Sequence, residues 1–396
     1  MTKAKEITGL NGAASASDGI KLTLTTRMDE MCVGRDAALD WSDIEGVHDM
    51  RVASRRLRSA LHDFAPYLRK RRLSVARGEL KAVAGALGKV RDHDVAIEEL
   101  EKLAAGAPPE IAAGIEKFAD ERRAARVGTR AMLLDALTEQ AITQLREDFS
   151  GALERAVKPR GKRQKKKKKR DGESADESFT FRDAGREIIT ARLAEVHELS
   201  ASLYHPLDAE PLHRLRIAAK RLRYAIELFS QCFPAGTLRP FAEEVAALQS
   251  SLGTLHDCDE WIAALGARLA RQAPSGHSDD HSGGRHGVAI DDHADAGDSA
   301  AGQSERCAAV WLLNRFVKTR AKHFRLSLAR WNEWETNRFV ARLHDALVMD
   351  ARLPAHYSGN GEPLSPEEID VVTVVESEAH HAASSPVGES EQAAGE

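Results

Sequence analysis

Histidine, arginine and lysine recur at helical spacing in one segment of the chain, Val47–Leu68. On a helix with 100° per residue, the cations fall on a single stripe. This stripe consists of His48, Arg51, Arg55, Arg58, His62 and Arg69. At a rise of 1.5 Å per residue, the distance from His48 to Arg58 is about 15 Å. A row of this kind suits a linear anion, because the guanidinium group binds phosphate oxygens through paired hydrogen bonds.

A second segment, Leu212–Phe233, repeats this pattern 165 residues later. Its stripe holds His213, Arg216, Lys220 and Arg223, while Glu227 takes the place of His62. The same offset aligns Ala86–Asp94 (ALGKVRDHD) with Ser251–Asp259 (SLGTLHDCD). An offset held without a gap over more than sixty residues indicates an internal duplication.

The charge balance around the first stripe favours an anionic partner. Residues 47–91 hold twelve basic and three acidic side chains, an excess of nine positive charges. Stacked like charges destabilise a helix unless something neutralises them, although a solvated or salt-bridged face is the alternative interpretation. For His48 and His213, contact with the anion and positioning of a neighbouring arginine both remain open. We expect the acidic residues after each Leu-Gly pair to bind arginines: Asp92, Asp94, Asp257 and Asp259.

Helical periodicity without alternating strands predicts an all-α fold of two four-helix halves. On each repeated helix one sector is apolar, holding Met50, Ala53, Leu57, Ala60, Leu61, Phe64 and Leu68 in the first copy and Leu215, Ala218, Leu222, Ala225 and Phe229 in the second. Asp43 and Asp208 are predicted N-caps, and Pro211 is expected in a first turn. The eight predicted helices span residues 19–39, 44–68, 70–103, 109–157, 181–203, 211–233, 237–271 and 305–349.

Three segments have compositions typical of disorder. Because one of them is strongly acidic, the net charge of the whole chain understates the positive charge of the folded part. The chain of 396 residues has a net charge of −4. However, residues 158–170 contain ten basic side chains and residues 352–396 contain nine acidic ones. Local charge and low hydrophobicity predict disorder in these segments. The predicted organisation is a first repeat at 18–157, a linker at 158–179, a second repeat at 180–350 with an insertion at 272–303, and a tail at 351–396.

Several functional classes are disfavoured by the sequence. No run of about 18 apolar residues is present, and the first residues lack the apolar core of a signal peptide. The four cysteines form no Cys-x-x-Cys pair, which is typical of reduced thiols. We therefore expect a cytoplasmic protein with no membrane partner, no cofactor and no structural or catalytic metal.

The duplicated His-x-x-Arg-x-x-x-[Arg/Lys]-Arg-Leu-Arg helix and the later Leu-Gly-x-x-[Arg/His]-Asp-x-Asp segment resemble the CHAD domain, the conserved-histidine α-helical domain. The resemblance covers residues 18–349, except for the linker and the insertion at 272–303. The resemblance implies two four-helix bundles around a basic central groove that binds inorganic polyphosphate. It also implies recruitment to polyphosphate granules. Carried over by position, the groove residues are His48, Arg51, Arg55, Arg58, Arg91, His213, Arg216, Lys220 and Arg223.

The sequence departs from this family pattern, and rival functions exist. His256 stands where the first copy has Arg91. No Glu-x-Glu-x-Lys strand of a fused triphosphate-tunnel domain is found, so an attached phosphohydrolase is not expected. Nucleic acid is the nearest alternative ligand, but Tyr224 is the sole aromatic residue beside the stripes for base stacking. A metal-dependent phosphohydrolase using His48-Asp49 and His256-Asp257 is less favoured, since these dyads are not equivalent in the duplication.

Overall fold

The computed structural model describes residues 6–158, 179–271 and 296–348. Regular structure in these ranges is helical, and two isolated β-bridges join Ser15 to Thr180 and Leu68 to Val157. The predicted all-α class is confirmed. None of the described helices is sufficiently long and apolar to cross a membrane. Most of the predicted linker, most of the insertion and the whole of the tail lie outside the described residues.

The first repeat contains the four expected helices, two of them interrupted. Its helices are α1 (Ala16–Val33), α2 (Arg35–Leu39), α3 (Ile44–Asp63), α4 (Ser74–Ala105), α5 (Pro109–Ala136) and α6 (Glu139–Ala156). The fourth predicted helix is divided at Thr138, whose hydroxyl accepts a hydrogen bond from the amide of Ala141 and so caps a new helix. The predicted end of the second helix is also wrong: α3 stops at Asp63, and the 3₁₀ turns η1 (Ala65–Tyr67) and η2 (Lys70–Leu73) follow.

The second repeat has the same order of helices: α8 (Phe181–Leu199), η3 (Ser200–Tyr204), α9 (Ala209–Phe229), α10 (Arg239–Arg271), α11 (Ala296–Thr336) and α12 (Phe339–Val348). Because α11 begins at Ala296, the last eight residues of the predicted insertion are helical. Asp43 caps α3 by accepting from the amide of Glu45, as predicted. Asp208 is the N-cap residue of α9, as predicted, but its side chain makes no capping hydrogen bond, and Pro211 lies in the first turn of α9.

The apolar sectors of the two repeated helices form the core, as their periodicity predicts. Leu57 of α3 and Phe64, which follows this helix, are fully buried, and so are Leu222 and Phe229 of α9. The other predicted inward residues are also buried: Met50, Ala53, Ala60, Leu61, Leu68, Leu215, Ala218 and Ala225. Burial of a large aliphatic side chain contributes about 1.5–3 kcal/mol. The cations of each stripe are therefore held at the edge of a fixed core.

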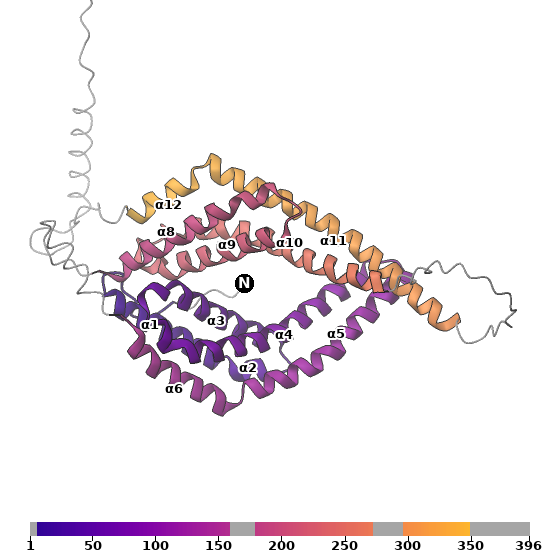
Figure 1. Ribbon diagram of the computed structural model, residues 1–396, viewed down its shortest axis with the longest axis horizontal. Helices are drawn as coiled ribbons and strands as arrows, with labels where there is room; N and C mark the ends of the chain where they lie inside the picture. Colours follow the sequence, from indigo (N-terminus) through magenta and orange to yellow (C-terminus); the bar gives the residue numbers. More distant parts are fainter. Residues whose placement is uncertain (1–5, 159–178, 272–295, 349–396) are drawn as a thin grey trace, which may run out of the picture. The chain divides into compact units, whose positions relative to one another are not determined.

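Two apolar contacts join the repeats within one compact unit, residues 1–344. In the first, Phe64, directly after α3, meets Phe181 of α8 and Phe229 of α9, with ring centroids 6.0 and 6.1 Å away. In the second, α5 packs against α11 (Figure 1). Gly114 permits this approach, because an added Cβ would lie 2.6 Å from the Cβ of Ala308. The repeats thus share core, and α3 is held against α9.

Candidate basic site between the repeats

The structure brings cations of the two stripes together. Helices α3 and α9 are in contact and lie side by side in Figure 1. Burial lowers the pKa of Arg51, and the positive charge of Arg216, from the other repeat, lowers it further. Burial likewise lowers the pKa of Lys220, with further contributions from Arg216 and from Arg55 across the interface. Four of the predicted site residues therefore form one positive cluster, to which both repeats contribute.

This cluster has few carboxylate partners. Arg51 makes one long contact, 3.4 Å from its Nη2 to Oδ1 of Asp92. Five further predicted site residues make no hydrogen bond or ion pair with any residue in the described part of the chain: Arg55, Arg58, Arg91, Arg216 and Lys220. The alternative of a salt-bridged face is disfavoured at these five positions, because none of them forms an ion pair with a described residue.

The two histidines have different neighbours in the two repeats. Burial lowers the pKa of His48, and the charge of Arg91 on α4 lowers it further. In the second repeat, Nδ1 of His213 lies 3.1 Å from Nδ1 of His256 on α10. Burial and His256 lower the pKa of His213, so it is mainly neutral at pH 7. The replacement of Arg91 by His256 thus exchanges a permanent charge for a hydrogen-bonded pair of imidazoles, which the sequence pattern did not reveal.

Three of the four acidic residues after the Leu-Gly pairs bind arginines, as expected, whereas Asp257 forms no ion pair with an arginine among the described residues. Asp94 accepts from Arg126 of α5 at 2.9 Å, and Asp259 accepts from Arg320 of α11 at 2.5 Å. Asp92 contacts Arg51. Burial raises the pKa of Asp257, and the adjacent Arg216 opposes this effect. Asp92, Asp94 and Asp259 therefore orient arginines, and Asp92 does so for Arg51 of the first stripe.

The glycines of the Leu-Gly pairs lie beneath the stripe arginines. An added Cβ at Gly88 would be 3.9 Å from Nε of Arg51, and one at Gly253 would be 3.7 Å from Nε of Arg216. These are ordinary van der Waals separations. The glycine surface of α4 therefore lies against Arg51, and that of α10 lies against Arg216, so the two repeats have the same arrangement.

Arg223 does not join the cluster. Its side chain is buried, and its Nε lies 3.3 Å from Oε1 of Glu227, one turn further along α9. The first repeat has His62 at the position of Glu227, and there the equivalent Arg58 is exposed. The prediction that Arg223 shares a surface with the other cations therefore meets a physical obstacle, which is its local carboxylate partner.

Comparison with known proteins agrees with this geometry. Residues 23–266 match the model of the family described as the CHAD domain. The chain belongs to the CHAD domain family. This family is associated with polyphosphate binding. The match covers both repeated helices and the two Leu-Gly segments, which are the parts of the chain that supply the cluster.

Relatives of this CHAD protein include two uncharacterized proteins of Mycobacterium tuberculosis, MT2285 and Rv2226. Each is 28% identical over 219 residues, which are 54% of this chain and 40% of the relative. The match thus spans less than half the length of these relatives. Among solved structures, the CHAD domain of the plant Ricinus communis has a TM-score of 0.56 at 20% identity, covering 81% of this chain and 96% of its own. PptA from Streptomyces chartreusis has a TM-score of 0.54 at 16% identity, covering 81% and 100%. Both share the fold.

A possible set of metal ligands occurs at the start of α3. Glu45, His48 and Asp49 offer ligand atoms within 4.8 Å of one another, and they are the one such group in the described ranges. The predicted alternative also required His256 and Asp257, which belong to no such group there. His256 instead contacts His213, and Asp257 lies beside Arg216. The geometry therefore does not favour the two-dyad metal site.

Lys220 supplies a test of the electrostatic strain in the cluster. Burial and the nearby arginines lower its pKa from the usual 10.5 to about 8. A lowered lysine pKa destabilises the folded state below pH 8, and this cost disappears as the pH rises from 8 to 10.5. We expect Lys220→Met to raise the stability at pH 7 by about 2–3 kcal/mol. It should also remove this component of the pH dependence.

Thermal unfolding of the ligand-free protein at pH 7 and pH 10 measures both effects. Lys81→Met is the matched control, since Lys81 is an exposed lysine of α4. If Lys220→Met lowers the melting temperature at pH 7, or matches the control, the cluster is not under electrostatic strain.

Proposed function

We propose that the cations of α3, α4 and α9 bind inorganic polyphosphate in a groove between the repeats. One observation supports this proposal: the two repeats place positive side chains close to one another, and among the described residues only Arg51 of this cluster forms an ion pair, a long one with Asp92. A linear polyanion removes that repulsion, and each guanidinium fork matches a pair of phosphate oxygens. The proposed contact residues are His48, Arg51, Arg55, Arg58, Arg91, His213, Arg216 and Lys220. Arg223 is not among them, because its side chain is buried beside Glu227.

The surroundings of Tyr224 favour polyphosphate over nucleic acid as the ligand. Proteins that bind single strands stack successive bases on exposed aromatic side chains. Tyr224 is only 7% exposed, and the guanidinium groups of Arg55 and Arg223 lie over its ring. The one aromatic residue beside the stripes therefore offers no surface for a base. A ligand that presents phosphate alone fits the site better.

Binding, rather than hydrolysis, is the activity we propose. The carboxylates next to the cluster are engaged by arginines, as Asp92 and Asp94 show. In the described part of the chain, these two carboxylates orient cations, which supports binding over activation of water by them. Because we propose that this site binds polyphosphate, we also propose that it recruits the protein to polyphosphate granules.

Titration of the purified protein with polyphosphates of several lengths, at two salt concentrations, tests the proposal. We expect affinity to increase with chain length and to fall with salt, because binding releases counterions. DNA and RNA should compete poorly at equal phosphate concentration. Effective competition by nucleic acid, or release of phosphate on adding a divalent metal, would contradict the assignment. In cells that contain granules, a fluorescent fusion should form foci on them.

A further inference from the structure

Tyr224 of α9 lies beneath a stripe arginine from the other repeat. The guanidinium carbon of Arg55, on α3, is 5.6 Å from the centroid of the Tyr224 ring. Arg55 has no ion pair with a described residue, and its Nε is buried without a hydrogen-bond partner. Its positive charge lowers the pKa values of Arg51 and Lys220. The ring is therefore the contact that holds a cation at the centre of the cluster, where its neighbours repel it.

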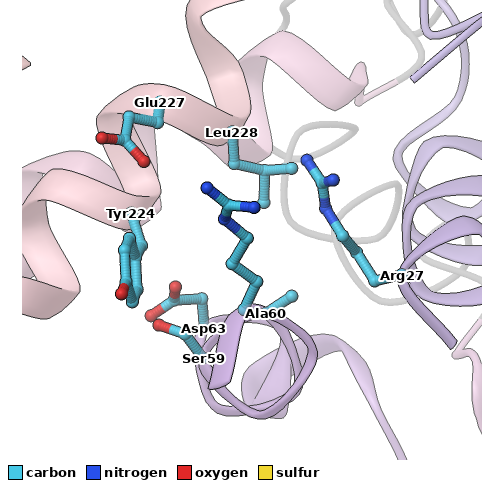
Figure 2. A pocket seen from close by; sticks show the side chains of 8 residues that line it. Arg27, Ser59, Ala60, Asp63, Tyr224, Glu227 and Leu228 are labelled. Atoms are coloured by element: carbon cyan, nitrogen blue, oxygen red, sulfur yellow. The ribbon is translucent and has the colours of Figure 1, made fainter. Parts of the chain in front are cut away.

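The hydroxyl end of Tyr224 points into a small cavity between the repeats. This cavity has a volume of about 20 Å³ and is lined by residues of α1, α3 and α9 (Figure 2). Three buried oxygens with no protein partner lie on its wall: Oγ of Ser59, Oδ2 of Asp63 and the hydroxyl of Tyr224. In Figure 2 these three side chains turn toward one another. The other oxygen of Asp63 is fixed, because it accepts from Nε of Arg192 at 2.9 Å.

The chemistry of this cavity matches one water molecule. A water needs about 10–15 Å³ of this kind of volume and two to four polar partners. Such a molecule can donate to Asp63 and Ser59 while accepting from the hydroxyl of Tyr224. Each of these oxygens would otherwise remain desolvated, at a cost that native structures avoid. The cavity therefore connects Tyr224, at its hydroxyl end, to the Asp63–Arg192 ion pair.

We propose that Tyr224 is a positioning residue for Arg55: its ring holds the guanidinium toward the phosphate site, and a water bound to Ser59 and Asp63 anchors its hydroxyl. The inference rests on the proposed function, since Arg55 is positioned for a phosphate contact. It adds a residue outside the predicted contact set. It also explains how an arginine without a carboxylate partner keeps one orientation.

A measurement on the ligand-free protein tests the positioning alone. The side-chain protons of Arg55 should show an upfield ring-current shift in nuclear magnetic resonance spectra, with the signal assigned by its loss in Arg55→Lys. We expect the shift to persist in Tyr224→Phe, which keeps the ring, and to vanish in Tyr224→Leu. An ordinary shift for Arg55 in the unmodified protein would overturn the inference, whether or not polyphosphate binds.

Polyphosphate binding tests whether Tyr224 acts through Arg55. Tyr224→Leu should weaken binding of long polyphosphate about 3- to 10-fold. Tyr224→Phe should weaken it less, with a lower melting temperature because the buried water loses a partner. The matched control is Tyr204→Leu, because Tyr204 is an exposed residue of η3.

A double-mutant cycle separates positioning from a general structural role. In the Arg55→Ala background, adding Tyr224→Leu should cause no further loss of affinity. An additional loss as large as that of the single substitution would show that Tyr224 acts independently of Arg55, and the inference would fail. If no variant binds polyphosphate, but the ring-current shift behaves as expected, the proposed function fails while the contact stands.

Discussion

Neutralising either stripe is expected to weaken the binding of long polyphosphate by on the order of 100-fold or more. The variants are Arg51→Ala with Arg55→Ala and Arg58→Ala on α3, and Arg216→Ala with Lys220→Ala on α9. A long polyanion that contacts both stripes makes its second contact at a high effective concentration. Loss of either stripe removes this advantage, so combining the two sets should cost less than the product of the separate losses. Tripolyphosphate, which is too short to use both stripes, should be affected much less.

Two controls make this experiment specific. Substituting alanine for Lys70, Arg71 and Arg72 removes three exposed cations from η2, outside the stripes, and should have a small effect. Deleting residues 158–170 removes ten positive charges from the predicted linker. The salt dependence of affinity should decrease by about one unit of slope for each lost phosphate contact. If the deletion abolishes binding and the stripe variants bind normally, the linker is the binder and the groove is not.

Leu57→Asp and Leu222→Asp are expected to abolish folding of the unit that contains both repeats. Both leucines are fully buried. A carboxylate in either place lacks a partner, and its burial costs several kcal/mol. The total stability of a domain is only about 5–15 kcal/mol. Because the repeats share the aromatic contact of Phe64, we expect one substitution to unfold both.

Far-ultraviolet circular dichroism and thermal unfolding measure this effect. Arg51→Ala and Arg216→Ala serve as surface controls on the same two helices, and they should retain helicity with equal or greater stability. Retained cooperative unfolding in both aspartate variants would show that these helix faces are not the core. Loss of helicity in the arginine variants would assign a structural role to the stripes.

Much of this arrangement follows from periodicity. The helical period of 3.6 residues places Leu57 in the core and Arg51 at its edge. The duplication implies that Arg216 also lies at the edge of the core. Contacts between side chains of different helices cannot be predicted from periodicity in the same way. The burial of Arg223 depends on a single change, Glu227 in place of His62, which supplies a carboxylate one turn away.

Other features depended on distant pairings that no local pattern encodes. The contact between His213 and His256 joins α9 to α10 across 43 positions. Arg55 and Tyr224 belong to different repeats, so neither helix alone indicates their approach. The division of the fourth helix has a local signal, since Thr138 is a good N-cap, but continuous helix formers on both sides obscure it.

The shared aromatic contact has a consequence for how the protein is made. Phe64 packs against Phe181 and Phe229, the second of which follows it by 165 residues. At ribosomal rates of roughly 5–20 residues per second, Phe229 is added about 8–33 s after Phe64. During that interval the nascent first repeat has an uncovered aromatic side chain beside a row of unneutralised cations. The core around Phe64 is therefore complete only after α9 has been translated, and a polypeptide released earlier carries the cations of α3 and α4 without those of α9.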